Sequence, residues 1–277
     1  MPSRQSLITR SGDVAQRDTL RTKWDRNEET LGAWTFIPSP VTAESCARAG
    51  FDYVCIDTQH GAIGYDSVVP MVQAIELGGG IPIARVPWNE PGIIGKMLDA
   101  GCHGIIIPMV NTAEEARAAV RASRYAPLGS RSWGPAVSAP RHGDYRVWAD
   151  AHIAVIPMIE TVEALNNVDD ILSVDGIDAA YVGPADLAIS LGLGAAGNDG
   201  TPEFDNALST IIEACARHGV TPGIHATSDL AALRRRQGFK MITVSTDLPT
   251  LRTALADELD KARSVEAPLE KGGSAPY

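Results

Sequence analysis

Two carboxylates, Glu160 and Asp186, each stand at the end of a short apolar run. The runs Ile153 to Ile159 and Ala179 to Val182 are typical of buried parallel strands, and apolar residues recur at helical spacing between them. Such a strand-helix-strand unit brings the two carboxyl ends side by side, roughly 5 Å apart. Two acids there suit Mg2+ or Mn2+, with Co2+ also compatible, better than a closed zinc site. The alternative is that each acid only caps the following helix.

Polar residues follow two further apolar runs. Asp57 ends one run and is followed by Gln59 and His60, and Arg85 ends the next. A neutral imidazole with a pKa of about 6.5 moves protons at neutral pH, so His60 is the predicted general base. Arg85 is predicted to neutralise a developing enolate oxygen. The structural alternatives are a hydrogen-bonded loop histidine and a salt bridge across the mouth of the site.

Backbone groups are expected to contribute as well. Gly183, Pro184 and Ala185 lead from a strand into a helical start, whose free N–H groups can hold a substrate carboxylate. His225, at the end of a later run, is an additional candidate for the pocket wall. The remaining histidines are assigned no role; they are His103, His142, His152 and His218.

Alternation of apolar runs with Ala- and Leu-rich helical segments predicts the scaffold. The expected strands are Ala33 to Ile37, Tyr53 to Asp57, Pro82 to Arg85, Gly104 to Ile107, Ala154 to Ile159, Ala179 to Val182, Thr221 to His225 and Met241 to Val244. The expected helices are Thr42 to Ala49, Tyr65 to Leu77, Pro91 to Ala100, Ala113 to Ser123, Val162 to Leu172, Glu203 to His218, Ser228 to Gln237 and Leu248 to Ser264. This alternation predicts a (β/α)8 barrel with its site at the carboxyl ends of the strands, an open doubly wound sheet being the weaker alternative.

The chain divides into three expected segments. Residues 1–30 are a polar leader or a cover for the barrel bottom, residues 31–265 form the barrel domain, and residues 266–277 are a flexible tail. Two connections, Arg124 to Asp150 and Ile189 to Pro202, are long enough to suggest functional or mobile loops.

Composition narrows the class of protein. A net charge of -10 argues against a dedicated nucleic-acid binder, and no apolar run approaches the roughly 18 residues of a membrane span. The first thirty residues lack a signal-peptide apolar region, so a cytoplasmic protein acting on a small molecule is expected. Scattered cysteines without CxxC spacing indicate reduced thiols; they are Cys46, Cys55, Cys102 and Cys215.

Five segments carry a resemblance to the HpcH/HpaI family of metal-dependent (class II) pyruvate and 2-oxo acid aldolases, which includes 4-hydroxy-2-oxoheptanedioate and 2-dehydro-3-deoxyglucarate-type aldolases. They are AGFDYVCIDTQHG (49–61), ARVPWNEPGIIGKMLDAGCHGIIIPMV (84–110), RYAPLGSR (124–131), MIET (158–161) and VGPADL (182–187). The resemblance implies the metal, base and arginine roles given above, and places Asp57 near the metal waters. It also implies that Asp99 reaches the catalytic histidine of a neighbouring subunit, in a hexamer whose dimers exchange the last helix.

The resemblance implies a reversible aldol reaction between a 2-oxo acid and an aldehyde. Gln59 stands where many relatives have Glu, Met158 where an alignable relative has Gln, and Trp133 is a bulky residue in the long loop. These three are expected to set substrate preference. The alternatives are oxaloacetate decarboxylation or citramalyl- or citryl-CoA cleavage at the same enolate site, and a barrel that binds oxo acids without turnover. A CoA ester would call for a basic rim, for which the candidates are Arg124, Arg131 and Arg141.

Overall fold

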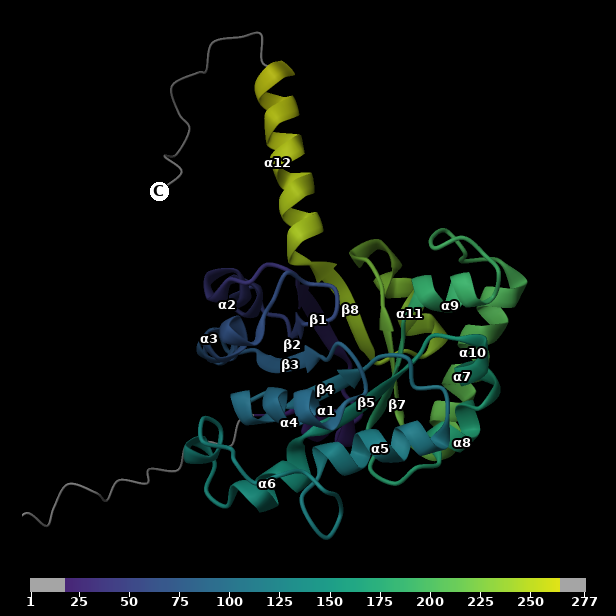
Figure 1. The fold of residues 1–277 in the computed structure, drawn as a ribbon. Coiled ribbons are helices and arrows are strands. Elements are labelled where there is room, and N and C mark those ends of the chain that lie inside the picture. The colour runs from purple at the N-terminus through teal and green to yellow at the C-terminus, as the bar shows by residue number, and fades with distance from the viewer. Residues whose placement is uncertain (1–17, 265–277) are drawn as a thin grey trace, which may run out of the picture.

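A computed structural model describes residues 18–264 of the chain, and within that range it is a closed barrel of eight parallel strands surrounded by helices (Figure 1). The strands are β1 (Thr30–Thr35), β2 (Tyr53–Asp57), β3 (Ile81–Arg85), β4 (Gly104–Ile107), β5 (Ala154–Ile159), β6 (Ala179–Val182), β7 (Thr221–His225) and β8 (Met241–Thr246). Their order around the barrel is their order in the sequence, and β8 pairs with β1. The predicted (β/α)8 barrel is confirmed. The tail expected at 266–277 and the first part of the leader lie outside the described residues.

The helices follow the strands with few exceptions. They are α1 (Leu20–Asp25), α2 (Pro40–Arg48), α3 (Tyr65–Gly78), α4 (Pro91–Ala100), α5 (Ala113–Ser123), η1 (Ala139–Arg141), α6 (Tyr145–His152), α7 (Val162–Asn166), α8 (Val168–Leu172), α9 (Pro184–Ser190), α10 (Pro202–His218), η2 (Ser228–Leu230), α11 (Ala231–Gln237) and α12 (Asp247–Ser264). The single helix expected over Val162 to Leu172 is interrupted at Asn167, whose side-chain amide donates to the carbonyl of Asn111.

The long connection before β5 is partly helical, which the sequence did not indicate. Helix α6 begins after Asp144, whose carboxylate accepts a hydrogen bond from the backbone N–H of Val147 (3.3 Å). Tyr145 and Ala149 are buried, so the helix is held by packing as well as by its cap. Its eight residues are too short for a clear apolar periodicity.

Alternate residues of each strand point into the barrel and form one buried cluster. It contains Trp34, Tyr53, Cys55, Ile81, Ile83, Ile106, Ala154, Ile156, Met158, Ala179, Tyr181 and Met241, together with Leu20 from α1. The residues in between pack outward against the helices in a larger cluster. Gly32 makes room for the Tyr53 ring, because a Cβ at that position would lie 2.0 Å from a ring atom. Asp57, Arg85, Glu160 and His225 continue the inward alternation at the carboxyl ends of their strands.

Residues 18–29 cover the amino-terminal end of the barrel. Leu20 is fully buried in the interior cluster, and Trp24 packs against it. Arg21 pairs with Asp178 at 2.9 Å, directly before β6. The described part of the expected leader is therefore built into the barrel bottom.

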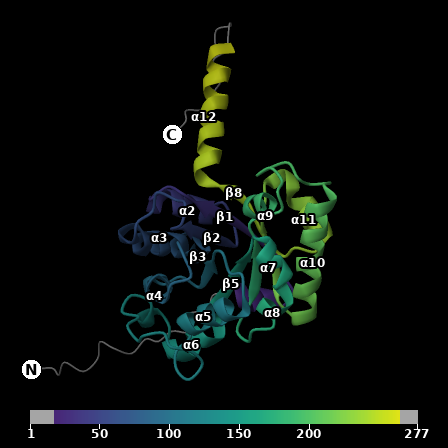
Figure 2. The ribbon, with the colours of Figure 1, turned by 45° about the vertical axis from the view of Figure 1, so that its right-hand side comes forward.

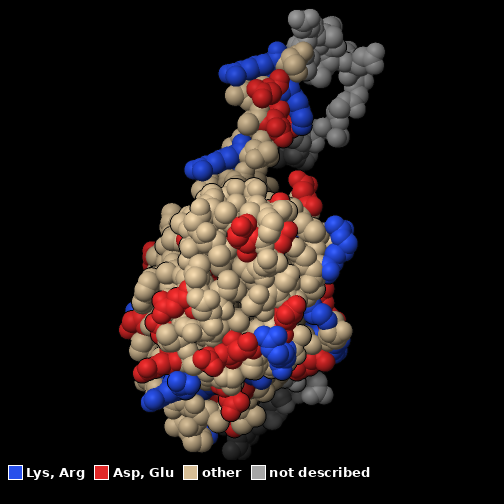
Figure 3. Space-filling model, turned by 90° about the vertical axis from the view of Figure 1, so that its right-hand side faces the viewer, with Lys and Arg blue, Asp and Glu red and all other residues tan. Residues whose placement is uncertain are grey.

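Helix α12 projects away from the barrel at the end of β8 (Figures 1 and 2). Leu251, Leu255 and Leu259 are exposed on it at a spacing of four residues, so they form one apolar stripe. Among residues 18–264, no helix is long and apolar enough to cross a membrane. On the face of the barrel formed by helices such as α10 and α11, acidic and basic side chains are interspersed (Figure 3).

Candidate active site

Asp57 is the anchor of the carboxyl end of the barrel. Its side chain is fully buried, and Oδ1 accepts hydrogen bonds from Arg85 Nε (3.0 Å) and from the backbone N–H groups of Gln59 (3.0 Å) and His60 (3.2 Å). Oδ2 accepts from Arg85 Nη2 (2.5 Å) and Trp34 Nε1 (3.0 Å). Burial alone would raise the pKa of Asp57, but the hydrogen bonds and charge of Arg85 lower it. Its acceptor positions are all occupied by protein donors, and through them Asp57 fixes Arg85, Trp34 and the backbone that leads to His60.

Arg85 is held by Asp57 and by the ring of Trp34. Two of its nitrogens bind Asp57, and its guanidinium carbon lies 5.0 Å from the centre of the Trp34 ring. Nη1 makes no hydrogen bond to any residue in the described range, although the side chain is largely buried. A fixed, charged donor with one free N–H edge is suited to an anionic or ketone oxygen of a substrate.

His60 and Gln59 lie on the connection between β2 and α3. The backbone of this connection is fixed by Asp57, whereas the His60 side chain is exposed. Gln59 is half-buried, and its Oε1 is buried without a hydrogen-bond partner among the residues that the structure describes. A buried unpaired acceptor at the mouth of a site indicates that a ligand or water donates to it.

Glu160 is buried next to Met109 and Gly183. Its Oε1 accepts a hydrogen bond from the backbone N–H of Met109 (2.9 Å), which has a left-handed backbone with φ of 55°. A Cβ on Gly183 would lie 2.3 Å from Glu160 Oε2, so only glycine leaves room for the carboxylate. Burial raises the pKa of Glu160 to about 7; the Met109 hydrogen bond opposes the rise, and the negative charge of Asp186 adds to it.

Asp186 is exposed at the start of α9, where its charge acts on Glu160. No side chain caps α9, so the free N–H groups after Gly183 and Pro184 face no competing side-chain acceptor. Within residues 18–264, no three His, Cys, Asp or Glu side chains gather to hold a metal ion. The two carboxylates, one of them desolvated, nevertheless fit a hard divalent cation that keeps positions for water and substrate.

Asp99 and Trp133 do not lie next to Asp57, Arg85 and Glu160. Helix α4 runs from the end of β3 back to the start of β4, so Asp99, near its last residue, lies at the opposite end of the barrel from Asp57. Its carboxylate binds Arg131 Nη2 at 2.6 Å.

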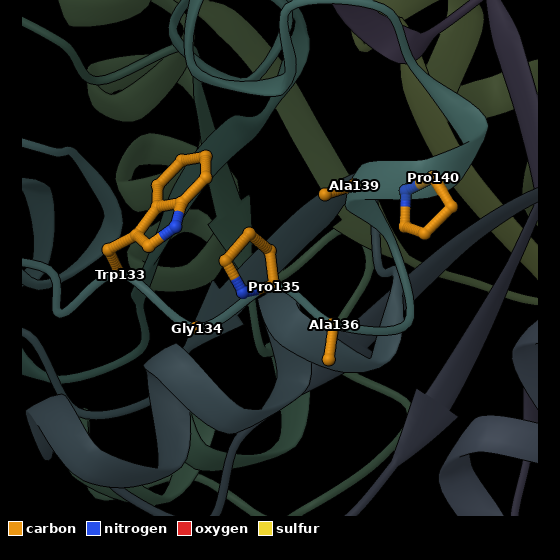
Figure 4. A pocket seen from close by; sticks show the side chains of 6 residues that line it. All are labelled: Trp133, Gly134, Pro135, Ala136, Ala139 and Pro140. Atoms are coloured by element: carbon orange, nitrogen blue, oxygen red, sulfur yellow. The ribbon is translucent and has the colours of Figure 1, made fainter.

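Trp133 lies on the same side of the barrel as Asp99, where it packs at a tilt against Tyr125. Its ring centre lies 5.2 Å from that of Tyr125, and with Pro135, Ala139 and Pro140 it lines a hollow of about 300 Å3 (Figure 4). Neither Asp99 nor Trp133 contacts His60 or Arg85 of its own chain within the described residues. The predictions for these two residues therefore require a second subunit.

The three arginines of the expected basic rim are occupied. Arg124 pairs with Asp178 (3.2 Å), Arg131 with Asp99 (2.6 Å) and Arg141 with Glu76 (2.5 Å). Arg124 and Arg131 are also buried. These ion pairs weaken the CoA-ester alternative, because each of the three candidate guanidiniums neutralises a carboxylate of the barrel.

Comparison with known proteins gives consistent matches. The profile of the HpcH/HpaI aldolase/citrate lyase family matches residues 31–254. A hydroxypyruvate/pyruvate aldolase of Rhizorhabdus wittichii is 40% identical over 248 residues, which are 89% of this chain and 99% of that protein. A 4-hydroxy-2-oxo-heptane-1,7-dioate aldolase of Klebsiella pneumoniae is 38% identical over 80% of this chain and 84% of that protein. The crystal structure of an HpcH/HpaI aldolase/citrate lyase family protein of Burkholderia cenocepacia superimposes with a TM-score of 0.81, at 33% identity, over 88% of this chain and 99% of that one.

Replacing Gly183 with Ala tests whether Glu160 and Asp186 bind a divalent cation. The added Cβ would displace the Glu160 carboxylate, so we expect Mn2+ to bind about 10–100-fold more weakly, as measured by titration with electron paramagnetic resonance. The control is Gly194→Ala, because the nearest atom to that Cβ is 3.9 Å away. Equal Mn2+ affinity in the two variants would contradict the assignment.

Proposed function

The chain belongs to the HpcH/HpaI aldolase/citrate lyase family and is a carbon-carbon lyase, and from this premise we propose that it cleaves 4-hydroxy-2-oxo acids reversibly. The products are pyruvate, or a substituted pyruvate such as hydroxypyruvate, and an aldehyde. The observation that carries the proposal is the Arg85 guanidinium, fixed by Asp57 with Nη1 free, at the barrel end that also holds Glu160. This combination suits a reaction in which negative charge develops on a ketone oxygen.

A divalent cation, Mg2+ or Mn2+, is part of this proposal. Glu160 and Asp186 would hold it, and when bound it supplies Lewis-acid polarisation of the 2-oxo acid. The burial of Glu160 supports this assignment: its carboxylate has one hydrogen bond within the described residues, from the Met109 N–H, and a nearby cation would favour the ionised form that burial disfavours.

The remaining steps of substrate binding and proton transfer are assigned to other residues of the site. Arg85 binds the ketone oxygen through Nη1 and stabilises the charge that develops there during carbon-carbon cleavage. His60, exposed at the mouth, takes the proton from the 4-hydroxyl group as the bond breaks and returns a proton to the methyl carbon of pyruvate, through water where needed. Gln59 and Met158 line the pocket beside them. The turn at Gly183, Pro184 and Ala185 offers its backbone N–H groups to the substrate carboxylate; Pro184 has no N–H and contributes only the bend.

An imine mechanism has little support. It needs a lysine nucleophile in the pocket. Lys96 lies on α4 with its ammonium 4.6 Å from the centre of the Tyr65 ring, and Lys240 precedes β8 at the other end of the barrel. Decarboxylation of oxaloacetate uses the same groups and is therefore tested alongside aldol cleavage.

We also propose that the active unit is a cytoplasmic homo-oligomer, a hexamer made of dimers that exchange α12. The projecting helix with its leucine stripe supports exchange, since a single chain leaves Leu251, Leu255 and Leu259 exposed. Asp99 and Trp133 lie on one side of the barrel, where they can approach the site of a second copy.

Metal removal tests the reaction class. We expect pyruvate release from a panel of 4-hydroxy-2-oxo acids, assayed with lactate dehydrogenase, to stop after treatment with EDTA and to return with Mn2+ or Mg2+. Oxaloacetate is included in the panel. Cleavage that continues after the metal has been removed would refute the proposed mechanism, and release from oxaloacetate alone would favour the decarboxylase.

Replacing His60 with Ala tests the proton transfer. We expect hydrogen exchange at the methyl group of pyruvate, followed by NMR in D2O, to slow about 100-fold or more. His218→Ala is the matched control, since His218, the last residue of α10, pairs with Asp169 of α8 on the outside of the barrel. An unchanged rate in the His60 variant would assign the proton transfer to another group.

Replacing Leu251, Leu255 and Leu259 together with Gln tests the exchange of α12. We expect the mass measured by light scattering to fall below that of the wild type, because the apolar contact is lost while helix propensity is kept. Asp257→Gln with Lys261→Gln on the opposite face is the control. A triple variant with the wild-type mass would show that assembly does not use this stripe.

A further inference from the structure

A chain of hydroxyl groups crosses the barrel interior and ends at His225. Tyr53 and Thr243 share a hydrogen bond of 2.9 Å between their hydroxyl oxygens. The Tyr181 hydroxyl donates to Thr243 Oγ1 at 2.6 Å and lies 3.4 Å from Nδ1 of His225. Tyr53, Tyr181 and Thr243 are fully buried, so this chain is fixed by packing from β2, β6 and β8.

The chain determines which nitrogen of His225 carries its proton. A phenol has one proton, and that of Tyr181 is donated to Thr243 over the shorter distance. In its contact with His225, Tyr181 can then only accept, so Nδ1 is the protonated nitrogen. Burial and the charge of Arg85 together lower the pKa of His225 to about 4, against the opposing charge of Asp57, so the ring is neutral at pH 7. Nε2 is therefore a hydrogen-bond acceptor.

His225 stands beside the group that binds the ketone oxygen. Its ring meets the Trp34 ring edge-on with 5.1 Å between centres, and Trp34 in turn lies under the Arg85 guanidinium. The side chain is half-buried at the carboxyl end of β7, next in the barrel after the strand that leads to Asp186. Nε2 has no partner among the described residues. A purely structural role would be satisfied by packing on Trp34 and would not need this oriented acceptor.

We propose that His225 Nε2 accepts a hydrogen bond from a hydroxyl group of the substrate, so that the site selects hydroxylated reactants over their deoxy analogues. The inference rests on the proposed aldolase function and specifies its substrate class. The hydroxyl belongs either to the oxo acid, as in hydroxypyruvate, or to the aldehyde, as in glycolaldehyde. Each supplies the O–H donor that an unprotonated imidazole nitrogen accepts.

Two substitutions distinguish the role of Nε2 of His225 from that of Nδ1. Gln places an amide oxygen near the position of Nε2 and keeps an acceptor there, whereas Asn reaches only the position of Nδ1. We expect His225→Asn to lower the preference for hydroxylated reactants about tenfold, and His225→Gln to keep it within about twofold of the wild type. His152→Asn, on the outer helix α6, is the matched control.

The preference is measured as a ratio of kcat/KM values in two arms. The first compares hydroxypyruvate with pyruvate as donors to one aldehyde, and the second compares glycolaldehyde with acetaldehyde as acceptors of pyruvate. A fall in one arm assigns the hydroxyl to that reactant. Wild-type ratios in both arms for His225→Asn would overturn the inference, while absence of turnover by the wild-type enzyme in every combination would instead refute the proposed function.

A second readout does not depend on turnover. In protein labelled with 15N-histidine, the signals lost in His225→Asn identify the ring, and we expect an Nδ1 shift typical of a protonated nitrogen and an Nε2 shift typical of an unprotonated one. The Nε2 signal should move toward lower shift when the hydroxylated reactant is added and stay in place with its deoxy analogue. A protonated Nε2 in the free enzyme would contradict the inference.

Discussion

The buried ion pair between Asp57 and Arg85 is the interaction on which the carboxyl end of the barrel depends. Two charges at a nearly water-free position are costly to desolvate, and their attraction compensates only when further hydrogen bonds satisfy the remaining polar atoms. Asp57 meets that condition with donors from Arg85, Trp34 and the start of the β2–α3 connection. One carboxylate therefore fixes the guanidinium, the indole beneath it and the backbone that carries His60.

Inside the barrel, below the Asp57–Arg85 pair, glycines on some strands leave room for large side chains on neighbouring strands. Gly32 leaves space for the ring of Tyr53, and the Cβ that Gly223 lacks would lie 3.0 Å from the ring of Tyr181. The two phenols can then lie inside the barrel and meet at Thr243. Gly183 likewise leaves room for the Glu160 carboxylate at the mouth of the barrel. Small residues on one strand thus decide where large or charged groups of the neighbouring strand can stand.

The strand ends could be predicted from the sequence. In a closed parallel barrel the strands are short apolar runs, and the polar residues that follow them all lie at the same end of the barrel. Asp57, Arg85 and Glu160 were found in this way. The left-handed backbone of Met109 was not, because a non-glycine residue adopts it only where the surrounding structure enforces it. The role of Trp34 could not be predicted either, since nothing in the sequence shows that its indole N–H meets Asp57. The pairing of Arg124, Arg131 and Arg141 also escaped prediction, because their partners lie far away in the chain.

The division between fixed and exposed groups follows the chemistry that each would perform in the proposed reaction. Arg85 and Glu160 must be in place before charge develops, so their orientation is determined by burial and by backbone donors. His60 must exchange protons with water and with substrate atoms that change position, which a fully buried imidazole could not do. His225 lies between these cases: its ring is fixed by Trp34 and Tyr181, yet one nitrogen remains available. A residue of this kind adds little to the rate of bond cleavage itself, but it can discriminate between substrates, because an acceptor fixed at a partly dry site loses a hydrogen bond when the hydroxyl is absent.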